Sequence, residues 1–88
     1  MTERQVLIVN PLGLHARPAA QFVKLAAGFS CQVEVVKDGA PVNGKSIMGV
    51  MMLAAESGCT LILRADGADE LGAVEALAAL VASGFGET

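Results

Sequence analysis

The stretch Gly13-Leu14-His15-Ala16-Arg17-Pro18-Ala19 decides how the chain begins to fold, because it joins a strand pattern to a helix pattern. An apolar run at residues 6–9 ends just before it, and Asn10-Pro11 breaks that run. From Ala16 to Ala27 the apolar residues follow the spacing of an amphipathic helix. The single histidine of the chain, His15, therefore lies where a helix is predicted to begin.

A histidine at a helix start lies in surroundings that suit phosphate chemistry. The first backbone N–H groups of a helix have no internal partners, and the macrodipole attracts anions to that end. The same field disfavours protonated imidazole, so His15 is expected to stay neutral and nucleophilic. Arg17 adds a planar guanidinium that can bind a phosphoryl group. The residues favour a phosphate-carrying histidine. The simpler alternatives are a plain helix cap or a satisfied loop residue at His15, and a plain surface charge at Arg17.

The remaining sequence alternates between strand and helix patterns. Alternating apolar residues and turn signals such as Asp38-Gly39 predict strands, and helical spacing predicts helices. The predicted strands are Gln5–Val9, Gln32–Lys37, Ala40–Asn43 and Thr60–Ala65, and the predicted helices are Ala16–Ala27, Ile47–Leu53 and Ala68–Ala82. Because short hairpins make neighbouring strands antiparallel, we predict one α+β domain over residues 1–88, with a four-stranded antiparallel sheet and three helices on one face.

The apolar positions also predict which faces turn inward. On the last predicted strand, Leu61, Leu63 and Ala65 share one face. The first helix is expected to bury a face of small residues, namely Ala16, Ala19, Ala20, Val23, Ala26 and Ala27. The last helix is expected to bury Leu71, Val74, Leu77, Ala78 and Val81.

The composition argues against several classes of function. The net charge of −3, without a basic stripe, argues against nucleic-acid binding. The longest apolar runs, Val50–Ala55 and Ala76–Ala82, are too short to span a bilayer, and the first residues have no signal-peptide pattern, so we expect a cytoplasmic protein. Cys31 and Cys59 are far apart and read as small buried residues. Neither a metal nor a cofactor is expected, because a zinc site with His15 lacks a fourth ligand.

A second informative stretch is Lys45-Ser46-Ile47-Met48-Gly49-Val50-Met51. Ser46 is placed to cap the short helix that follows. That helix is apolar nearly all round, yet only one side can face the sheet, and Val50 and Leu53 are the natural inward positions. We therefore expect an exposed docking patch, defined as Ile47, Met48 and Met51, with full burial of the helix as the alternative.

Both stretches, in this order, resemble those of the HPr family, the histidine-containing phosphocarriers of the bacterial phosphoenolpyruvate-dependent phosphotransferase system, and the resemblance covers essentially the whole chain. It implies an open-faced β-sandwich. It also implies that His15, with Arg17 beside it, accepts phosphate at Nδ1 from enzyme I and passes it to an IIA-type acceptor domain. The last helix and the tail at residues 83–86 look more like carriers of the nitrogen-related branch, or of proteobacteria without a full sugar-transport system.

The resemblance extends to regulation and to partner binding. Ser46 resembles the regulatory serine that an HPr kinase/phosphorylase modifies, which would give a phosphoserine besides the phosphohistidine. We expect a monomer that meets its partners through Ala16, Ala20, Lys24, Lys45, Ile47, Met48 and Met51. Lys24 is expected to be a solvated charge that faces a partner.

A phosphocarrier, and not an enzyme with its own turnover, is the function that these residues favour. One nucleophile and one arginine leave nothing to activate a phosphate donor, so the partner must do that. The alternative is a regulatory binding protein that acts through the Ser46 face on a transcription factor or other partner. The presence of His15 argues against that as the sole role.

Overall fold

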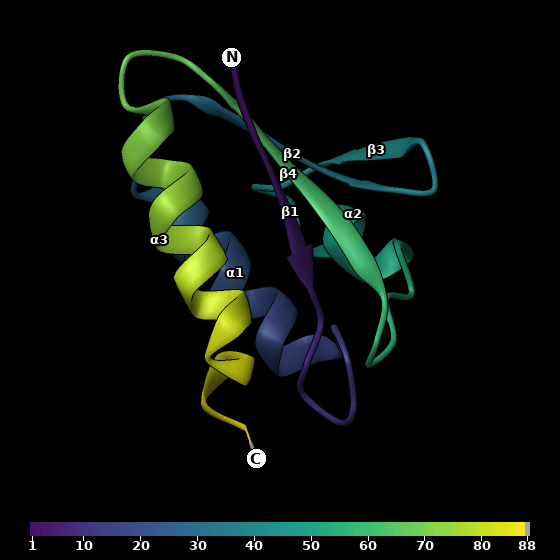
Figure 1. The fold of residues 1–88 in the computed structure, drawn as a ribbon. Coiled ribbons are helices and arrows are strands. Elements are labelled where there is room, and N and C mark those ends of the chain that lie inside the picture. Colours follow the sequence, from purple (N-terminus) through teal and green to yellow (C-terminus); the bar gives the residue numbers. More distant parts are fainter. Residues whose placement is uncertain (88) are drawn as a thin grey trace.

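The computed structural model of the protein describes residues 1–87, which form one antiparallel sheet and three α-helices (Figure 1). The elements in chain order are β1 (Thr2–Leu7), α1 (Ala16–Ala27), β2 (Gln32–Lys37), β3 (Ala40–Asn43), α2 (Ile47–Met52), β4 (Thr60–Asp66), α3 (Glu70–Ala82) and a short 3-10 turn, η1 (Gly84–Gly86). The order of strands and helices agrees with the prediction.

The sheet has the strand order β1-β4-β2-β3, and every neighbouring pair is antiparallel. The helices lie together on one face, where α1 and α3 run side by side, α3 packs on β1 and β4, and α2 packs against α1 (Figure 1). The other face of the sheet is left uncovered. The predicted fold class, an open-faced β-sandwich with three helices on one face, is therefore confirmed.

The core lies between the sheet and the helices. Leu61, Leu63 and Ala65 of β4 are buried on one face of the strand, as predicted. The helices cover them with Phe22 of α1 and Leu77 of α3. Each large side chain of this kind contributes roughly 1.5–3 kcal/mol when it leaves water. This layer of apolar contacts fixes the position at which α1 begins.

The first strand differs from its predicted bounds. It runs over Thr2–Leu7 instead of Gln5–Val9, because its pairing with β4 extends from Thr2 opposite Ala65 to Leu7 opposite Thr60. Backbone pairing with a long neighbour draws in polar residues that alternation alone does not mark. The other bounds differ by one or two residues: α2 ends at Met52, β4 ends at Asp66 and α3 begins at Glu70.

The inner face of α1 was predicted only in part, because Ala19 and Ala26 are buried as expected and Val23 is partly buried against the core. Ala16, Ala20 and Ala27 are exposed, and the buried residues are Pro18, Ala19, Phe22 and Ala26. Phe22 is 2% exposed and lies at the centre of this face. A phenylalanine removes far more apolar area from water than an alanine, so its burial sets the rotation of the helix.

The inner face of α3 also needs one correction. Val74, Leu77, Ala78 and Val81 are buried as predicted, but Leu71 is 68% exposed and Ala73 is buried instead. At 100° per residue Leu71 lies roughly 90° from the centre of the buried stripe, at the first turn of the helix. The buried stripe is therefore rotated toward Ala73 at the start of the helix.

Asp69, just before α3, ties the start of this helix to the segment between α1 and β2. Its carboxylate accepts the backbone N–H groups of Ser30 at 2.8 Å and of Cys31 at 2.9 Å. The hydrogen bond from Ser30 is the main reason that the pKa of Asp69 falls from its usual 3.8 to about 2. The ionised form of Asp69 is therefore the one that the folded state prefers.

We predict that Asp69→Asn lowers the melting temperature at pH 7 by several degrees, because an amide N–H would face a backbone N–H. Because the pKa of Asp69 is lower in the folded state than in the unfolded chain, ionised Asp69 stabilises the fold at pH values above its usual pKa of 3.8. This stabilisation is lost as the pH falls through the folded-state pKa of about 2. Thermal melts from pH 7 to pH 2 should show the difference from wild type shrinking with acid. Glu56→Gln is the control, since no hydrogen bond or salt bridge of its side chain is found within residues 1–87. A difference that stays constant down to pH 2 would contradict this role.

Candidate functional site

The loop between β1 and α1 is held against the segment that follows α2. The N–H of Leu14 donates to the carbonyl of Ala55 at 2.9 Å. Gly13 has a φ of +66°, and a Cβ atom on it would lie 2.3 Å from the same Ala55 oxygen. Only glycine fits this conformation and this close approach. The contact therefore fixes where the next residue, His15, meets the helix.

His15 is the N-cap residue of α1, in extended backbone geometry with φ −74° and ψ −173°. Its carbonyl accepts the N–H of Ala19 at 3.0 Å and so closes the first turn. The imidazole makes no capping hydrogen bond, and the side chain is 37% exposed. The helix-cap alternative is therefore correct for the backbone of His15, but its side chain makes no capping hydrogen bond. The backbone of His15 caps the helix, and its ring is left for other contacts.

A carboxylate from the other end of the chain contacts the ring. The two carboxylate oxygens of Glu87 lie 3.1 and 2.9 Å from Nε2 of His15. The side-chain amide of Asn10 donates to Glu87 at 3.0 Å and to the carbonyl of Gly13 at 2.7 Å. The C-terminal end of the chain lies beside the loop after β1 in Figure 1, in agreement with these contacts.

The charge of Glu87 is favoured in this position. The hydrogen bond with His15 is the largest reason that its pKa lies below its usual value, and the Asn10 amide and the charges of His15 and Arg17 add to it. Neither Glu87 nor Asn10 was predicted from the sequence to belong to this site. Asn10 was read as a strand breaker, and no local pattern links an acidic residue near the chain end to a histidine 72 positions earlier.

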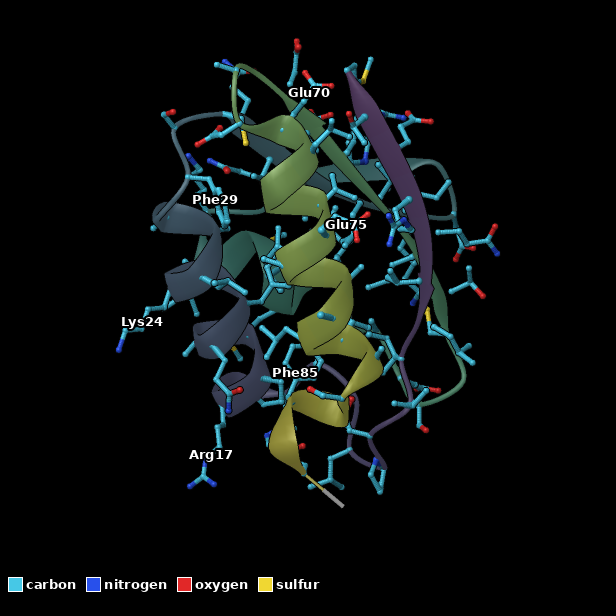
Figure 2. All side chains as sticks on the ribbon, turned by 60° about the vertical axis from the view of Figure 1, so that its left-hand side comes forward. Arg17, Lys24, Phe29, Glu70, Glu75 and Phe85 are labelled. Carbon is cyan, nitrogen blue, oxygen red and sulfur yellow. The ribbon has the colours of Figure 1, made fainter. Side chains whose placement is uncertain are left out.

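The surroundings of the ring on α1 are small and exposed. Ala16 and Ala20 are exposed, which agrees with their predicted place on a partner-facing surface. The side chains of Arg17 and Lys24 extend away from α1 into solvent (Figure 2). Arg17 lies within the first turn, two residues after His15. The guanidinium of Arg17 is therefore free of hydrogen bonds and salt bridges within residues 1–87.

Ser46 caps α2 as predicted. Its Oγ accepts the backbone N–H of Gly49 at 3.1 Å. The neighbouring Lys45 has a structural contact of its own, since its ammonium donates to the carbonyl of Phe29 at 2.6 Å, beyond the end of α1. The charge of Lys45 is therefore partly engaged within the fold.

The orientation of α2 is also as predicted. Val50 and Leu53 are buried, whereas Ile47, Met48 and Met51 are exposed, and Met48 is the most exposed of the docking patch at 73%. Met52 is 78% exposed and was not part of the prediction. Because α2 packs against α1, the docking patch lies on the element next to the one that His15 begins.

Two negative observations apply to the described chain. Within residues 1–87 no group of three or more His, Cys, Asp or Glu side chains is arranged to hold a metal ion. In the same range no helix has the length and apolar character needed to cross a membrane.

Comparison with known proteins agrees with this architecture. A family model described as the PTS HPr component phosphorylation site matches residues 2–83. The phosphocarrier protein HPr of Cupriavidus necator is 52% identical over 87 residues, with 99% of this chain and 98% of that protein covered. The crystal structure of HPr from Thermoanaerobacter tengcongensis superposes with a TM-score of 0.96 at 50% identity, and covers 100% of this chain and 99% of that chain.

These matches define the class of the protein as a phosphocarrier of the phosphotransferase system, and not an enzyme with its own turnover. The chain belongs to the HPr family. The resemblance on which the sequence analysis relied is thereby confirmed. A further solved structure, an HPr dimer from T. tengcongensis, matches at a TM-score of 0.79 and 50% identity over 99% of this chain and 100% of that one. The expectation that this chain is a monomer stays a prediction.

Proposed function

We propose that His15 is the residue that accepts phosphate from enzyme I and passes it to an IIA-type acceptor domain. The observation that carries this proposal is the partly exposed imidazole at the N-cap of α1, which does not spend its ring nitrogens on capping. The first N–H groups of the helix and the macrodipole favour an anion beside that ring. Membership of a phosphocarrier family supports the same assignment.

Arg17 is the proposed stabiliser of the transferring group. Its exposed guanidinium, on the same helix turn as His15, can approach the oxygens of an incoming phosphoryl group without losing any buried contact. A planar guanidinium binds such oxygens in a bidentate manner. The positive charge of Arg17 stabilises the transition state most, because negative charge accumulates on the phosphoryl group during transfer. Arg17 is therefore expected to affect the rate of transfer more than the affinity for the partner.

The docking patch of Ile47, Met48 and Met51 is the proposed contact for enzyme I and for the acceptor. These three side chains place flexible apolar groups on the surface of α2, and methionine adapts to more than one partner. Ala16 and Ala20 leave room for close approach beside His15, and Lys24 offers a charge at the edge. The proposed interface is completed by Lys45 beside Ser46.

Ser46 is the proposed site of regulation by an HPr kinase/phosphorylase. A phosphate there would add about two negative charges next to the docking patch. Within the protein the added charge would meet the start of α2, where negative charge is stabilising. Its effect is therefore expected on partner binding and not on the fold. The other candidate, a regulatory protein acting only through this face, would use the same patch but leave His15 without phosphate.

We place this carrier in the cytoplasm, where its phosphotransferase partners are expected to meet it. The proposed carrier domain covers residues 1–88, of which Thr88 lies outside the described residues. The system to which the acceptor belongs, sugar transport or nitrogen-related, follows from the identity of that acceptor.

The first prediction concerns the phosphorylated residue. Incubation with enzyme I and phosphoenolpyruvate should add one acid-labile phosphoryl group to the wild type and to Ser46→Ala, and none to His15→Ala, because only an imidazole forms so labile a bond here. Intact-mass spectrometry before and after acid treatment measures this. Equal phosphorylation of His15→Ala would exclude the carrier assignment to His15.

The second prediction concerns the docking patch. Met48→Asp should weaken binding to enzyme I by about 2 kcal/mol or more, because a charge would enter the centre of a desolvated contact. Met52→Asp is the matched control, since it places the same charge on an equally exposed methionine of the same helix. Isothermal titration calorimetry compares the two. Equal binding of both variants would place Met48 outside the interface.

The third prediction concerns Ser46. Ser46→Asp, with about half the charge of a phosphate, should slow phosphorylation of His15 without lowering the melting temperature. Ser46→Asn controls for loss of the hydroxyl, because asparagine also caps a helix but carries no charge. Rapid-quench kinetics and thermal melts measure the two effects. A slower reaction that tracks a fall in melting temperature, or an unchanged rate, would contradict the proposal.

A further inference from the structure

The ring of His15 contacts the carboxylate of Glu87, and that carboxylate in turn accepts a hydrogen bond from the side chain of Asn10. Both oxygens of Glu87 lie within hydrogen-bond distance of Nε2, on the ring atom farther from the backbone. One of these oxygens also accepts the amide of Asn10 at 3.0 Å. Asn10 is only 1% exposed, so the group that orients Glu87 is itself buried.

The orientation of the Asn10 amide follows from its neighbours. The carbonyl of Gly13 and the carboxylate of Glu87 can only accept hydrogen bonds, so the NH₂ group must face both of them. The carbonyl oxygen of Asn10 then has no hydrogen-bond partner within residues 1–87. A buried polar atom without a partner is rare in proteins and needs an explanation. The explanation here is that Asn10 gives both of its donors to the loop and to Glu87.

We propose that Glu87 is a positioning residue that keeps the proton of neutral His15 on Nε2 and leaves Nδ1 as the atom that attacks phosphorus. An ionised carboxylate has no proton to donate, so the ring nitrogen facing it must be the N–H. Neutral imidazole has a single N–H, and the other nitrogen then carries the lone pair. This inference rests on the proposed function, in which His15 is the phosphate acceptor.

Glu87 acts in the transfer step as well. The lone pair of Nδ1 forms a bond to the phosphorus of the donor, and the bond between phosphorus and the donor breaks with its electron pair leaving on the donor. No proton moves, because Nε2 keeps its hydrogen. The ring then has substituents on both nitrogens and carries a positive charge that the carboxylate of Glu87 faces directly. The reverse transfer to an acceptor removes that charge.

The test uses full-length protein labelled with ¹⁵N in histidine, at a pH where imidazole is neutral. Two-dimensional ¹H–¹⁵N NMR should show wild-type Nε2 as the protonated nitrogen and Nδ1 as the unprotonated one. In Glu87→Ala both signals should move toward each other, because the ring exchanges between its two tautomers. Glu87→Gln should keep the wild-type pattern, since its amide oxygen can still accept from Nε2. Glu75→Gln, a carboxylate removed from distant α3, should change nothing.

The rate of phosphorylation is the second measurement. The rate of phosphorylation by enzyme I should fall about tenfold in Glu87→Ala, the size expected for one charge-assisted hydrogen bond at a partly exposed site. The rate of Glu87→Gln should lie between those of the wild type and Glu87→Ala, because glutamine keeps the tautomer but lacks the negative charge. An unchanged tautomer pattern in Glu87→Ala would overturn the inference, and so would a wild-type rate. The NMR experiment needs no phosphate, so it decides on Glu87 even if His15 proved not to be the acceptor.

Discussion

One backbone contact supports the rest of the site: the hydrogen bond from Leu14 to Ala55, made at a point where a Cβ on Gly13 would not fit. It joins the loop that carries His15 to the segment after α2. Together with the apolar packing of α1 on the sheet and on α2, this contact fixes where α1 begins. The same contact holds His15 and Arg17 of α1 close to α2, the helix that carries the proposed docking patch.

Charged side chains outside the helices tie the ends of α1 and α2 to the rest of the fold. Lys45 closes the end of α1 by donating to Phe29, and Lys37 donates to Leu53 at the end of α2. Ammonium groups at helix ends satisfy carbonyls that have no partner in the helix. Asp69 does the equivalent for the two N–H groups that follow α1. Several of the few charged side chains of this protein therefore make hydrogen bonds within the fold. Arg17 and Lys24, the cations of α1, extend into solvent instead.

Local signals carried the sequence predictions that were confirmed. The bounds of α1, the hairpin between β2 and β3 and the cap at Ser46 depend on residues a few positions apart, and those interactions can be read directly from the sequence. The predictions that were wrong depend on distant partners. Leu71 and three alanines of α1 (Ala16, Ala20 and Ala27) were misplaced because the sheet and Phe22 set the rotation of each helix. The contact between His15 and Glu87 lies beyond any local pattern, because the fold alone brings the chain end to the loop.

The proposed transfer requires Nδ1 of His15 to be the reactive atom, because Nε2 contacts the carboxylate of Glu87. The direct measurement is ¹⁵N NMR of the protein after phosphorylation by enzyme I, with histidine labelled in the ring. The account predicts that phosphate is bonded to Nδ1 and that Nε2 keeps its hydrogen. A phosphate bonded to Nε2, or to a residue other than His15, would contradict it.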